Sequence, residues 1–311
     1  LVHHAPRRGR EGAGRAMKLY RDFRTQEELD AHYRLDLVCD VQAYMEGWQR
    51  DSERARAELE HRPDVPYGPS LDERLDLFPA PPRAGGGRGA PPILIFIHGG
   101  YWRRFTAREF SFVARGPTAA GLTTLVPTYS LCPKVTVDEI VRQMRAAVAW
   151  AWRNADEIGG DRERIFVAGH SAGGHLTAMC LLTDWEGGYG LPRDVVKGGC
   201  AISGLFDLRP FPYTYLQPAL QLDMAQALRN SPHLLDLPGA APPLLVTYGT
   251  AETPEFQRQS EDFLARWRGH GLAGRSFPQP GRDHFTAIAD LADADAPLTV
   301  EIRRMVEGQG G

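Results

Sequence analysis

Apolar runs of strand length alternate with segments of helical periodicity along most of this chain. Strands are predicted at residues 93–97, 123–129, 164–168, 198–203, 243–249 and 274–277. Apolar positions at helical spacing predict helices at 138–155, 172–182, 255–268 and 297–306. Such an alternation is typical of a mostly parallel sheet with helices on both faces, whose functional site lies beyond the carboxyl ends of the strands.

The remaining segments complete one predicted domain over residues 18–311. Residues 18–60 are expected to form one or two helices, whose apolar face carries Leu29, Tyr33, Leu37, Val41, Tyr44 and Trp48. An edge strand is expected at 71–78, and the Pro- and Gly-rich stretch that follows is expected to be a loop. Residues 208–241 are the longest stretch without a clear strand, so we expect a lid or pocket insertion there.

Composition narrows the classes of partner. The 311 residues include 36 basic and 39 acidic side chains, and the net charge of −3 provides no basic surface for nucleic acid or anionic lipid. No apolar stretch reaches the length of a membrane span. We therefore expect a small-molecule substrate, with neither nucleic acid nor membrane as a partner; the oligomeric state is left open, a homodimer included.

The cysteines and residues 1–17 indicate the cellular compartment. Four scattered cysteines form no C-x-x-C pair and no metal-ligand spacing, so buried thiols in a reducing compartment are expected, with no metal and no cofactor. Residues 1–17 are rich in Arg and Gly and lack the apolar run of a signal peptide. They are expected to form a disordered tail, with a transit peptide as the alternative, and the expected location is the cytoplasm.

The clearest chemical motif is G-x-S-x-G at residues 169–173, between a predicted strand and a predicted helix. In that context the glycines permit a tight turn that projects Ser171 at a helix N-terminus, where backbone N–H groups favour negative charge. Ser171 is therefore the candidate nucleophile. The alternative is an ordinary serine in a Gly-rich turn.

A second motif, His98-Gly99-Gly100-Tyr101-Trp102, follows the predicted strand 93–97. Two adjacent glycines leave backbone N–H groups accessible, as an oxyanion hole requires, so Gly99, Gly100 and the N–H of Ala172 are the candidate donors. His98 is expected to fix the loop. Aromatic side chains near these motifs are candidates for the substrate-binding wall, with core packing as the alternative: Tyr101, Trp102, Tyr129 and Phe206.

The base and the acid should follow the nucleophile in the order Ser, acid, His. His284 comes after the last predicted strand and is the candidate base. Glu252 follows the second strand after the nucleophile strand, where the acid usually stands, whereas Asp207 follows the first. Asp207 has an alternative role as a cap or as a partner of Arg209. Asp283 is a third candidate, although adjacent side chains rarely point at each other.

Six segments together give the chain a specific resemblance: HGGYW, VPTYSLCP, AGHSAGGHLTAM, AISGLFDLRP, GTAETPEFQRQS and DHF. From about Tyr67 to His284 the chain resembles the kynurenine formamidase (arylformamidase) branch of the α/β hydrolases, which is related to the hormone-sensitive-lipase-like esterases. The resemblance implies an α/β-hydrolase fold and a triad of Ser171, Glu252 and His284. The acid in better-known members is Asp, whereas Glu252 stands at the matching position here.

The resemblance also implies a reaction. Members of this branch hydrolyse N-formyl-kynurenine to kynurenine and formate through a formyl-serine intermediate, without a metal. A carboxylesterase for short-acyl or aryl esters is the alternative, because it would use the same residues. A small-molecule-binding relative without catalysis is a third hypothesis, which does not require an intact triad.

Overall fold

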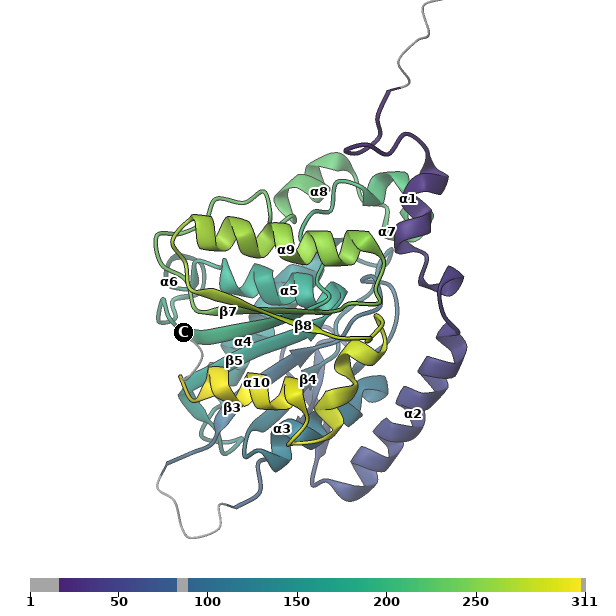
Figure 1. Ribbon diagram of the computed structural model, residues 1–311. Coiled ribbons are helices and arrows are strands. Elements are labelled where there is room, and N and C mark those ends of the chain that lie inside the picture. Colours follow the sequence, from purple (N-terminus) through teal and green to yellow (C-terminus); the bar gives the residue numbers. More distant parts are fainter. Residues whose placement is uncertain (1–16, 83–88, 309–311) are drawn as a thin grey trace, which may run out of the picture.

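The computed structural model describes residues 17–82 and 89–308. These form an eight-stranded sheet of order β1-β2-β4-β3-β5-β6-β7-β8, in which β1 and β2 are antiparallel additions to six parallel strands (Figure 1). The strands are β1 (Arg62–Pro66), β2 (Arg74–Phe78), β3 (Pro92–Ile97), β4 (Thr123–Pro127), β5 (Asp161–His170), β6 (Val196–Ile202), β7 (Leu244–Gly249) and β8 (Gly274–Gln279).

Helices cover both faces of this sheet, as the alternating pattern predicts. The α-helices are α1 (Gln26–Tyr33), α2 (Val41–Glu58), α3 (Arg115–Ala119), α4 (Val137–Arg153), α5 (Ala172–Leu181), α6 (Trp185–Tyr189), α7 (Gln217–Leu220), α8 (Met224–Arg229), α9 (Pro254–Gly269) and α10 (Pro297–Val306). The 3-10 helices are η1 (Leu35–Leu37), η2 (Ala107–Ala114), η3 (Phe211–Tyr213) and η4 (Thr286–Ala292).

The central strand β3 is apolar at every position because both of its faces are covered. Ile93, Ile95 and Ile97 point into a core shared with α4, α5 and α9, whereas Leu94 and Phe96 point into a second core with η2 and α10. Successive side chains of a strand alternate between faces, so a continuous apolar run serves two cores. In Figure 1, α5 and α9 lie above the sheet and α3 and α10 lie below it.

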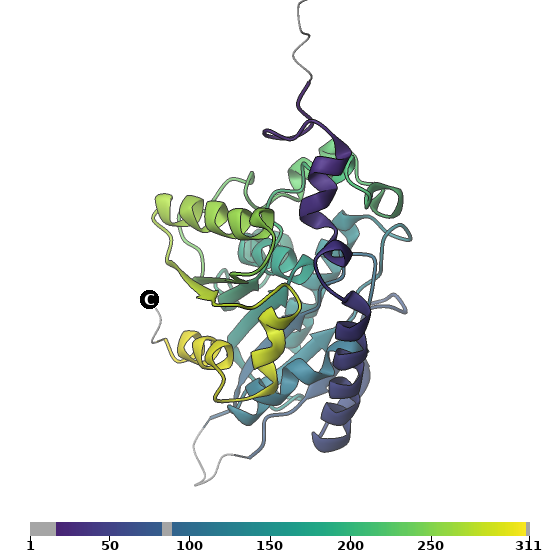
Figure 2. The ribbon, with the colours of Figure 1, turned by 45° about the vertical axis from the view of Figure 1, so that its right-hand side comes forward.

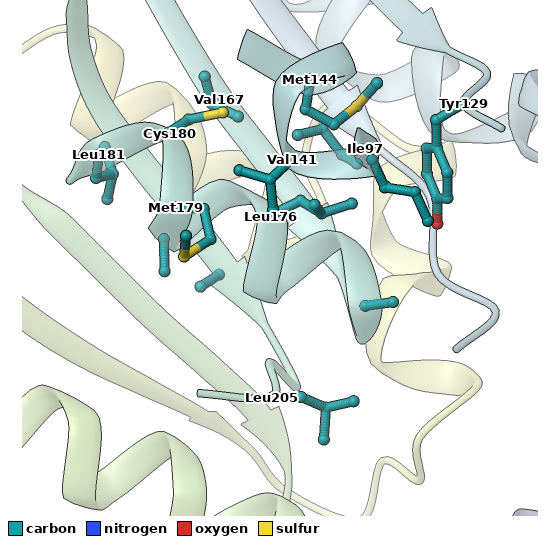
Figure 3. Packing of buried hydrophobic residues seen from close by; sticks show 14 of the residues in the cluster. Ile97, Tyr129, Val141, Met144, Val167, Leu176, Met179, Cys180, Leu181 and Leu205 are labelled. Atoms are coloured by element: carbon teal, nitrogen blue, oxygen red, sulfur yellow. The ribbon is translucent and has the colours of Figure 1, made fainter. Parts of the chain in front are cut away.

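The helix that begins after the nucleophile candidate is buried along its whole length. All ten residues of α5 are buried, and Leu176, Met179 and Cys180 pack among side chains of β3, β5 and α4 (Figure 3). A helix that is apolar all round is anchored on every side. The position of its first turn is thereby fixed relative to the sheet.

The N-terminal helices lie along one side of the sheet, and Figure 2, in which that side is turned forward, shows them as a continuous purple strip. The helix α1 contacts α9, and α2 contacts η2. Leu29, Tyr33 and Trp48 are buried as predicted, but Leu37 is 59% exposed. The prediction of one apolar face is wrong at Leu37 because α1 ends at Tyr33 and the chain turns before α2 begins.

Other differences from the prediction concern weakly patterned segments. The strand β1 was not expected, and it pairs outside β2, which is therefore an inner strand rather than an edge. Of the predicted tail at 1–17, residues 1–16 lie outside the described residues, as do residues 83–88 of the predicted loop. Within 17–82 and 89–308 no helix combines the length and hydropathy needed to span a bilayer.

Candidate active site

Ser171 stands on a sharp turn between β5 and α5. Its φ of 58° lies in the left-handed region, and its backbone N–H donates to the Ile202 carbonyl at 2.8 Å. A Cβ on Gly173 would lie 1.9 Å from the carbonyl oxygen of Ile97, so no other residue fits there. The turn is strained for serine, and such strain persists where the surrounding packing enforces it.

Glu252 and His284 form a buried pair at the ends of β7 and β8. His284 Nδ1 lies 2.7 Å from Glu252 Oε2, where the imidazole N–H donates to the carboxylate. The other oxygen, Oε1, accepts from Ser203 Oγ at 2.5 Å and from the backbone N–H of Gly249 at 2.7 Å. The sequence analysis did not single out Ser203, although Ser203 ends the predicted strand 198–203 and directly follows β6, which pairs with β7 just before Glu252.

The loop that carries His284 lies directly against the end of β7. A Cβ on Gly249 would come within 2.1 Å of the Arg282 carbonyl oxygen, and that oxygen accepts from the Ala251 N–H at 3.0 Å. The absence of a side chain at Gly249 therefore allows the acid loop and the histidine loop to approach each other. The His284 ring also packs on Phe256, with centroids 4.3 Å apart.

Ser171 and His284 both line a cavity of about 660 Å³. No hydrogen bond among the described residues joins the Ser171 hydroxyl to the imidazole. In enzymes without a bound substrate, catalytic hydrogen bonds are often long and tighten in the complex. The arrangement leaves Nε2 of His284 as the nitrogen available to a group in the cavity, because Nδ1 is bound to Glu252.

The candidate oxyanion donors surround the same serine. Gly99 and Gly100 line the cavity, and a Cβ on Gly99 would lie 3.1 Å from Ser171 Cβ. Ala172 is fully buried at the start of α5 and does not line the cavity. The N–H groups of these three residues donate to no acceptor in the part of the chain that the structure describes. These N–H groups therefore have no acceptor within the described chain, and Gly99 and Gly100 are the two donors whose residues line the cavity.

Three buried histidines support the loops around the serine. His98 Nδ1 lies 2.8 Å from the Gly99 carbonyl, and burial lowers the pKa of His98 from 6.5 to about 4. His175 accepts from Trp102 Nε1 at 3.2 Å and donates to the Asn230 carbonyl at 2.7 Å, and burial lowers its pKa to about 4 as well. His170 donates from Nε2 to the His284 carbonyl at 2.8 Å, and burial holds its pKa well below the ordinary value.

The other two acid candidates are engaged elsewhere. Asp207 accepts from Tyr20 and Arg209, and these hydrogen bonds outweigh the effect of burial, so its pKa lies below the usual range. Asp283 accepts from the Tyr44 hydroxyl at 2.6 Å and from the Thr286 N–H at 2.8 Å. Of the three carboxylates, Glu252 is the one that contacts the imidazole of His284.

The cavity wall differs from the predicted one. Tyr101 lines the cavity, but Trp102, Tyr129 and Phe206 do not, and this part of the prediction is corrected. Their rings pack in the core: Trp102 against His175, Tyr129 on His98 and Phe206 on Phe263. Sequence periodicity does not distinguish an aromatic ring that faces the cavity from one that packs in the core beneath the loop.

The N-terminal segment supplies much of the wall instead. Nine of the 21 lining residues come from η1, α2 and their flanks, and the predicted lid at 208–241 contributes Tyr215 alone. Trp48 of α2 packs its ring among Phe105, Phe110 and Phe285, which also line the cavity. The side chains of 17–82 and 89–308 include no group of three or more potential metal ligands.

Comparisons with known proteins identify the fold and the family. Residues 94–229 match a family model described as alpha/beta hydrolase fold. Kynurenine formamidase of Danio rerio is 32% identical over 270 residues, which cover 86% of this chain and 89% of that protein. Esterase LipQ of Mycobacterium tuberculosis is 26% identical over 73% of this chain and 57% of its own length. A protein from Silicibacter sp. TM1040 with a known crystal structure is 31% identical in sequence. Its structure superposes with a TM-score of 0.71, and the match covers 84% of this chain and 92% of the Silicibacter chain.

The extent of the formamidase match decides the classification. It spans 86% of this chain and 89% of the relative. The chain therefore belongs to the kynurenine formamidase-like branch of the α/β-hydrolase superfamily, and it is a hydrolase.

Proposed function

We propose that this protein is a serine hydrolase in which Ser171 is the nucleophile, His284 the base and Glu252 the acid. The observation that carries the proposal is the 2.7 Å contact between His284 Nδ1 and Glu252 Oε2 at the wall of the cavity that Ser171 also lines. A carboxylate on Nδ1 fixes the imidazole tautomer and leaves Nε2 free to accept a proton.

The mechanism follows from that arrangement. Ser171 Oγ attacks the carbonyl carbon of an amide or ester while His284 Nε2 takes its proton. The N–H groups of Gly99, Gly100 and Ala172 bind the oxyanion of the tetrahedral intermediate. His284 then gives the proton to the departing amine or alcohol. In the second half of the reaction, His284 takes a proton from water as the water attacks the acyl-serine, and it returns this proton to Ser171 Oγ when the acid leaves.

The substrate we propose is an aryl formamide, N-formyl-kynurenine, which is hydrolysed to kynurenine and formate. Support comes from the similarity to kynurenine formamidase and from the aromatic wall beside Ser171, formed by Trp48, Tyr101 and Phe110. The formyl group is the smallest acyl group, so it needs little space, and the aryl group would lie against the aromatic side chains.

A carboxylesterase acting on short-acyl or aryl esters is the second candidate. The similarity to an esterase of M. tuberculosis favours it, and every catalytic residue would be shared. The two activities differ in the leaving group alone, which the triad does not select.

Side-by-side kinetics on N-formyl-kynurenine and p-nitrophenyl acetate tests the proposal. We expect a higher kcat/KM for the formamide, and loss of both activities in Ser171→Ala with an unchanged melting temperature. A higher kcat/KM for the ester would favour the carboxylesterase. A fluorophosphonate probe should label the wild-type protein and not Ser171→Ala. A folded wild-type protein that stays unlabelled would instead support a binding protein without catalysis.

A further inference from the structure

The charges on the cavity wall are unevenly compensated. Three guanidinium groups and two carboxylates line it: Arg34, Arg103, Arg104, Asp36 and Asp40. Asp36 forms an ion pair with Arg34 at 2.6 Å, and Asp40 accepts from the Ala43 N–H at 3.1 Å as the N-cap of α2. Neither Arg103 nor Arg104 has a carboxylate within 4 Å in the described ranges. The uncompensated charge of the wall is therefore positive.

Of the two arginines, Arg103 is the better candidate for binding a ligand. Its Nε is buried and has no hydrogen-bond partner among the described residues, and the side chain is only partly exposed. Buried polar groups in native proteins are nearly always paired, so one that is not calls for an acceptor from outside the chain. A carboxylate suits a guanidinium especially well, because its two oxygens match two parallel N–H donors.

The loop that carries Arg103 is the one that carries the oxyanion glycines. Tyr101, Trp102 and Phe105 have positive φ values of 50°, 55° and 75°, an unusual cluster for residues other than glycine. The Tyr101 hydroxyl donates to the Tyr33 carbonyl at 2.8 Å, and the Trp102 carbonyl accepts from the Cys132 N–H at 2.8 Å. These contacts hold Arg103 at a fixed position relative to Gly99 and Gly100.

We propose that Arg103 is a specificity-determining residue that binds a carboxylate on the leaving group of the substrate. Arg104, which is exposed at the cavity mouth, adds positive charge without a buried contact. This proposal rests on the proposed function, since it takes the cavity around Ser171 to be the substrate site. It predicts that amides and esters with a carboxylate on the aryl leaving group are preferred over those with an uncharged carboxamide of the same shape. N-formyl-kynurenine carries such a carboxylate.

The test uses two pairs of substrates that differ in charge alone. One pair is N-formyl-kynurenine and its carboxamide; the other is the acetate ester of hydroxyphenylpropanoate and that of hydroxyphenylpropanamide. Arg103→Met removes the charge and keeps the length of the side chain. We expect it to lower kcat/KM for the carboxylate member of each pair by about 10- to 100-fold, mainly through KM, and to change the value for the carboxamide member less than about twofold.

Arg108→Met is the matched control, because Arg108 is exposed on the neighbouring η2, does not line the cavity and changes the net charge equally. It should leave all four values within about twofold of wild type. Arg103→Lys keeps the charge but loses the paired donors, so an intermediate loss of kcat/KM is expected for the two carboxylate substrates. An equal loss of kcat/KM in Arg103→Met for carboxylate and carboxamide substrates, or no loss for either, would overturn the proposal.

A measurement on the wild-type protein covers the case in which Arg103→Met does not fold. Phenylpropanoate should inhibit competitively at a concentration about tenfold lower than phenylpropanamide, and added salt should reduce the difference. Equal inhibition by the two compounds would contradict a role for Arg103 in binding a carboxylate. If the esters are hydrolysed but neither formamide is, the formamidase proposal fails, and the ester pair still decides the role of Arg103.

Discussion

Glu252, whose side chain is one methylene longer than the aspartate that the sequence resemblance implies, is held at both of its carboxylate oxygens. Ser203 and the Gly249 N–H fix Oε1, so that Oε2 is directed at His284 Nδ1. A longer acid has more rotamers, and each added hydrogen bond removes some of that freedom. The position of the imidazole therefore depends on Ser203 as well as on Glu252.

Replacement of the acid tests this assignment. Glu252→Gln keeps the size of the side chain but loses the charge that stabilises the imidazolium, so kcat should fall by a factor on the order of 10³ to 10⁴. The melting temperature should change little, because the amide can still accept from Ser203 and Gly249. Steady-state kinetics and thermal unfolding of the purified variant measure the two quantities.

Asp207→Asn provides the comparison. Asp207 binds Tyr20 and Arg209 rather than His284, so its loss should lower the free energy of unfolding by about 1–3 kcal/mol and leave kcat within about tenfold of wild type. The opposite ranking, with kcat falling steeply in Asp207→Asn and little in Glu252→Gln, would make Asp207 the acid.

Gly173, in the turn that follows Ser171, leads to a prediction about the free energy of unfolding. In Gly173→Ala the new Cβ would lie 1.9 Å from a backbone oxygen of β3, which cannot move without disrupting the sheet. We expect a loss of more than about 4 kcal/mol in the free energy of unfolding, or insoluble protein. Gly188→Ala in α6 is the control, since a Cβ there meets nothing within 4 Å and should stabilise by up to about 1 kcal/mol. Similar free energies of unfolding for the two variants would show that the turn has room for a Cβ at Gly173.

At the scale of elements, the N-terminal segment connects two loops of the site. The carbonyl of Tyr33, the last residue of α1, accepts from the Tyr101 hydroxyl of the oxyanion loop. The neighbouring carbonyl of His32 accepts from Thr253 Oγ1 at 2.6 Å, directly after Glu252. One short helix therefore contacts both the oxyanion loop and the acid loop, and the segment after it closes the cavity.

The role of this segment as a wall can be tested by filling the cavity from α2. Val41, the first residue of α2, lines the cavity, so Val41→Trp should obstruct it and lower kcat/KM for N-formyl-kynurenine by about tenfold or more. The smaller p-nitrophenyl acetate should be affected less. Leu37→Trp is the control because Leu37 is exposed and lies outside the lining. Equal activities of the two variants on both substrates would place the substrate elsewhere.

At the scale of the whole molecule, the buried histidines couple stability to pH. Burial lowers the pKa of His98 and His175 from 6.5 to about 4, and that of His170 well below 6.5. As pH falls below 6.5, the unfolded chain binds protons at these positions while the folded protein does not. The free energy of unfolding should therefore decrease between pH 6.5 and 4, by up to about 1.4 kcal/mol per pH unit for each histidine.

Urea unfolding at about pH 7.5 and about pH 5.5 measures this effect above the range where carboxylates titrate. His175→Gln is the matched variant, because an amide can accept from Trp102 and donate to the Asn230 carbonyl as the imidazole does. It should reduce the pH dependence by the contribution of one proton. An unfolding free energy that is the same at both pH values would contradict the neutral state of the buried histidines.

The elements that could be predicted are those with a strong period or a fixed motif. Strand β3 and the second half of β5 are continuous apolar runs, β7 is nearly so, and α4 and α10 have clear helical periodicity, so their predicted ranges agree with the structure within a few residues. The segment of β1 contains prolines and charged residues, and its pairing with β2 is a tertiary contact that local composition does not encode. The wall of the cavity was mispredicted for the same reason.

The sequence by itself determined the parallel sheet, the turn at Ser171 and the order of the candidate catalytic residues, because these depend on local periodicity and on glycines at fixed spacing. Only the tertiary structure decided which carboxylate reaches His284, which aromatic rings face the cavity, and that residues 34–48 rather than 208–241 cover it. The physical reason is distance along the chain. Glu252 and His284 are 32 residues apart, and Tyr33 and Tyr101 are 68 apart, so these contacts arise from packing of the whole core.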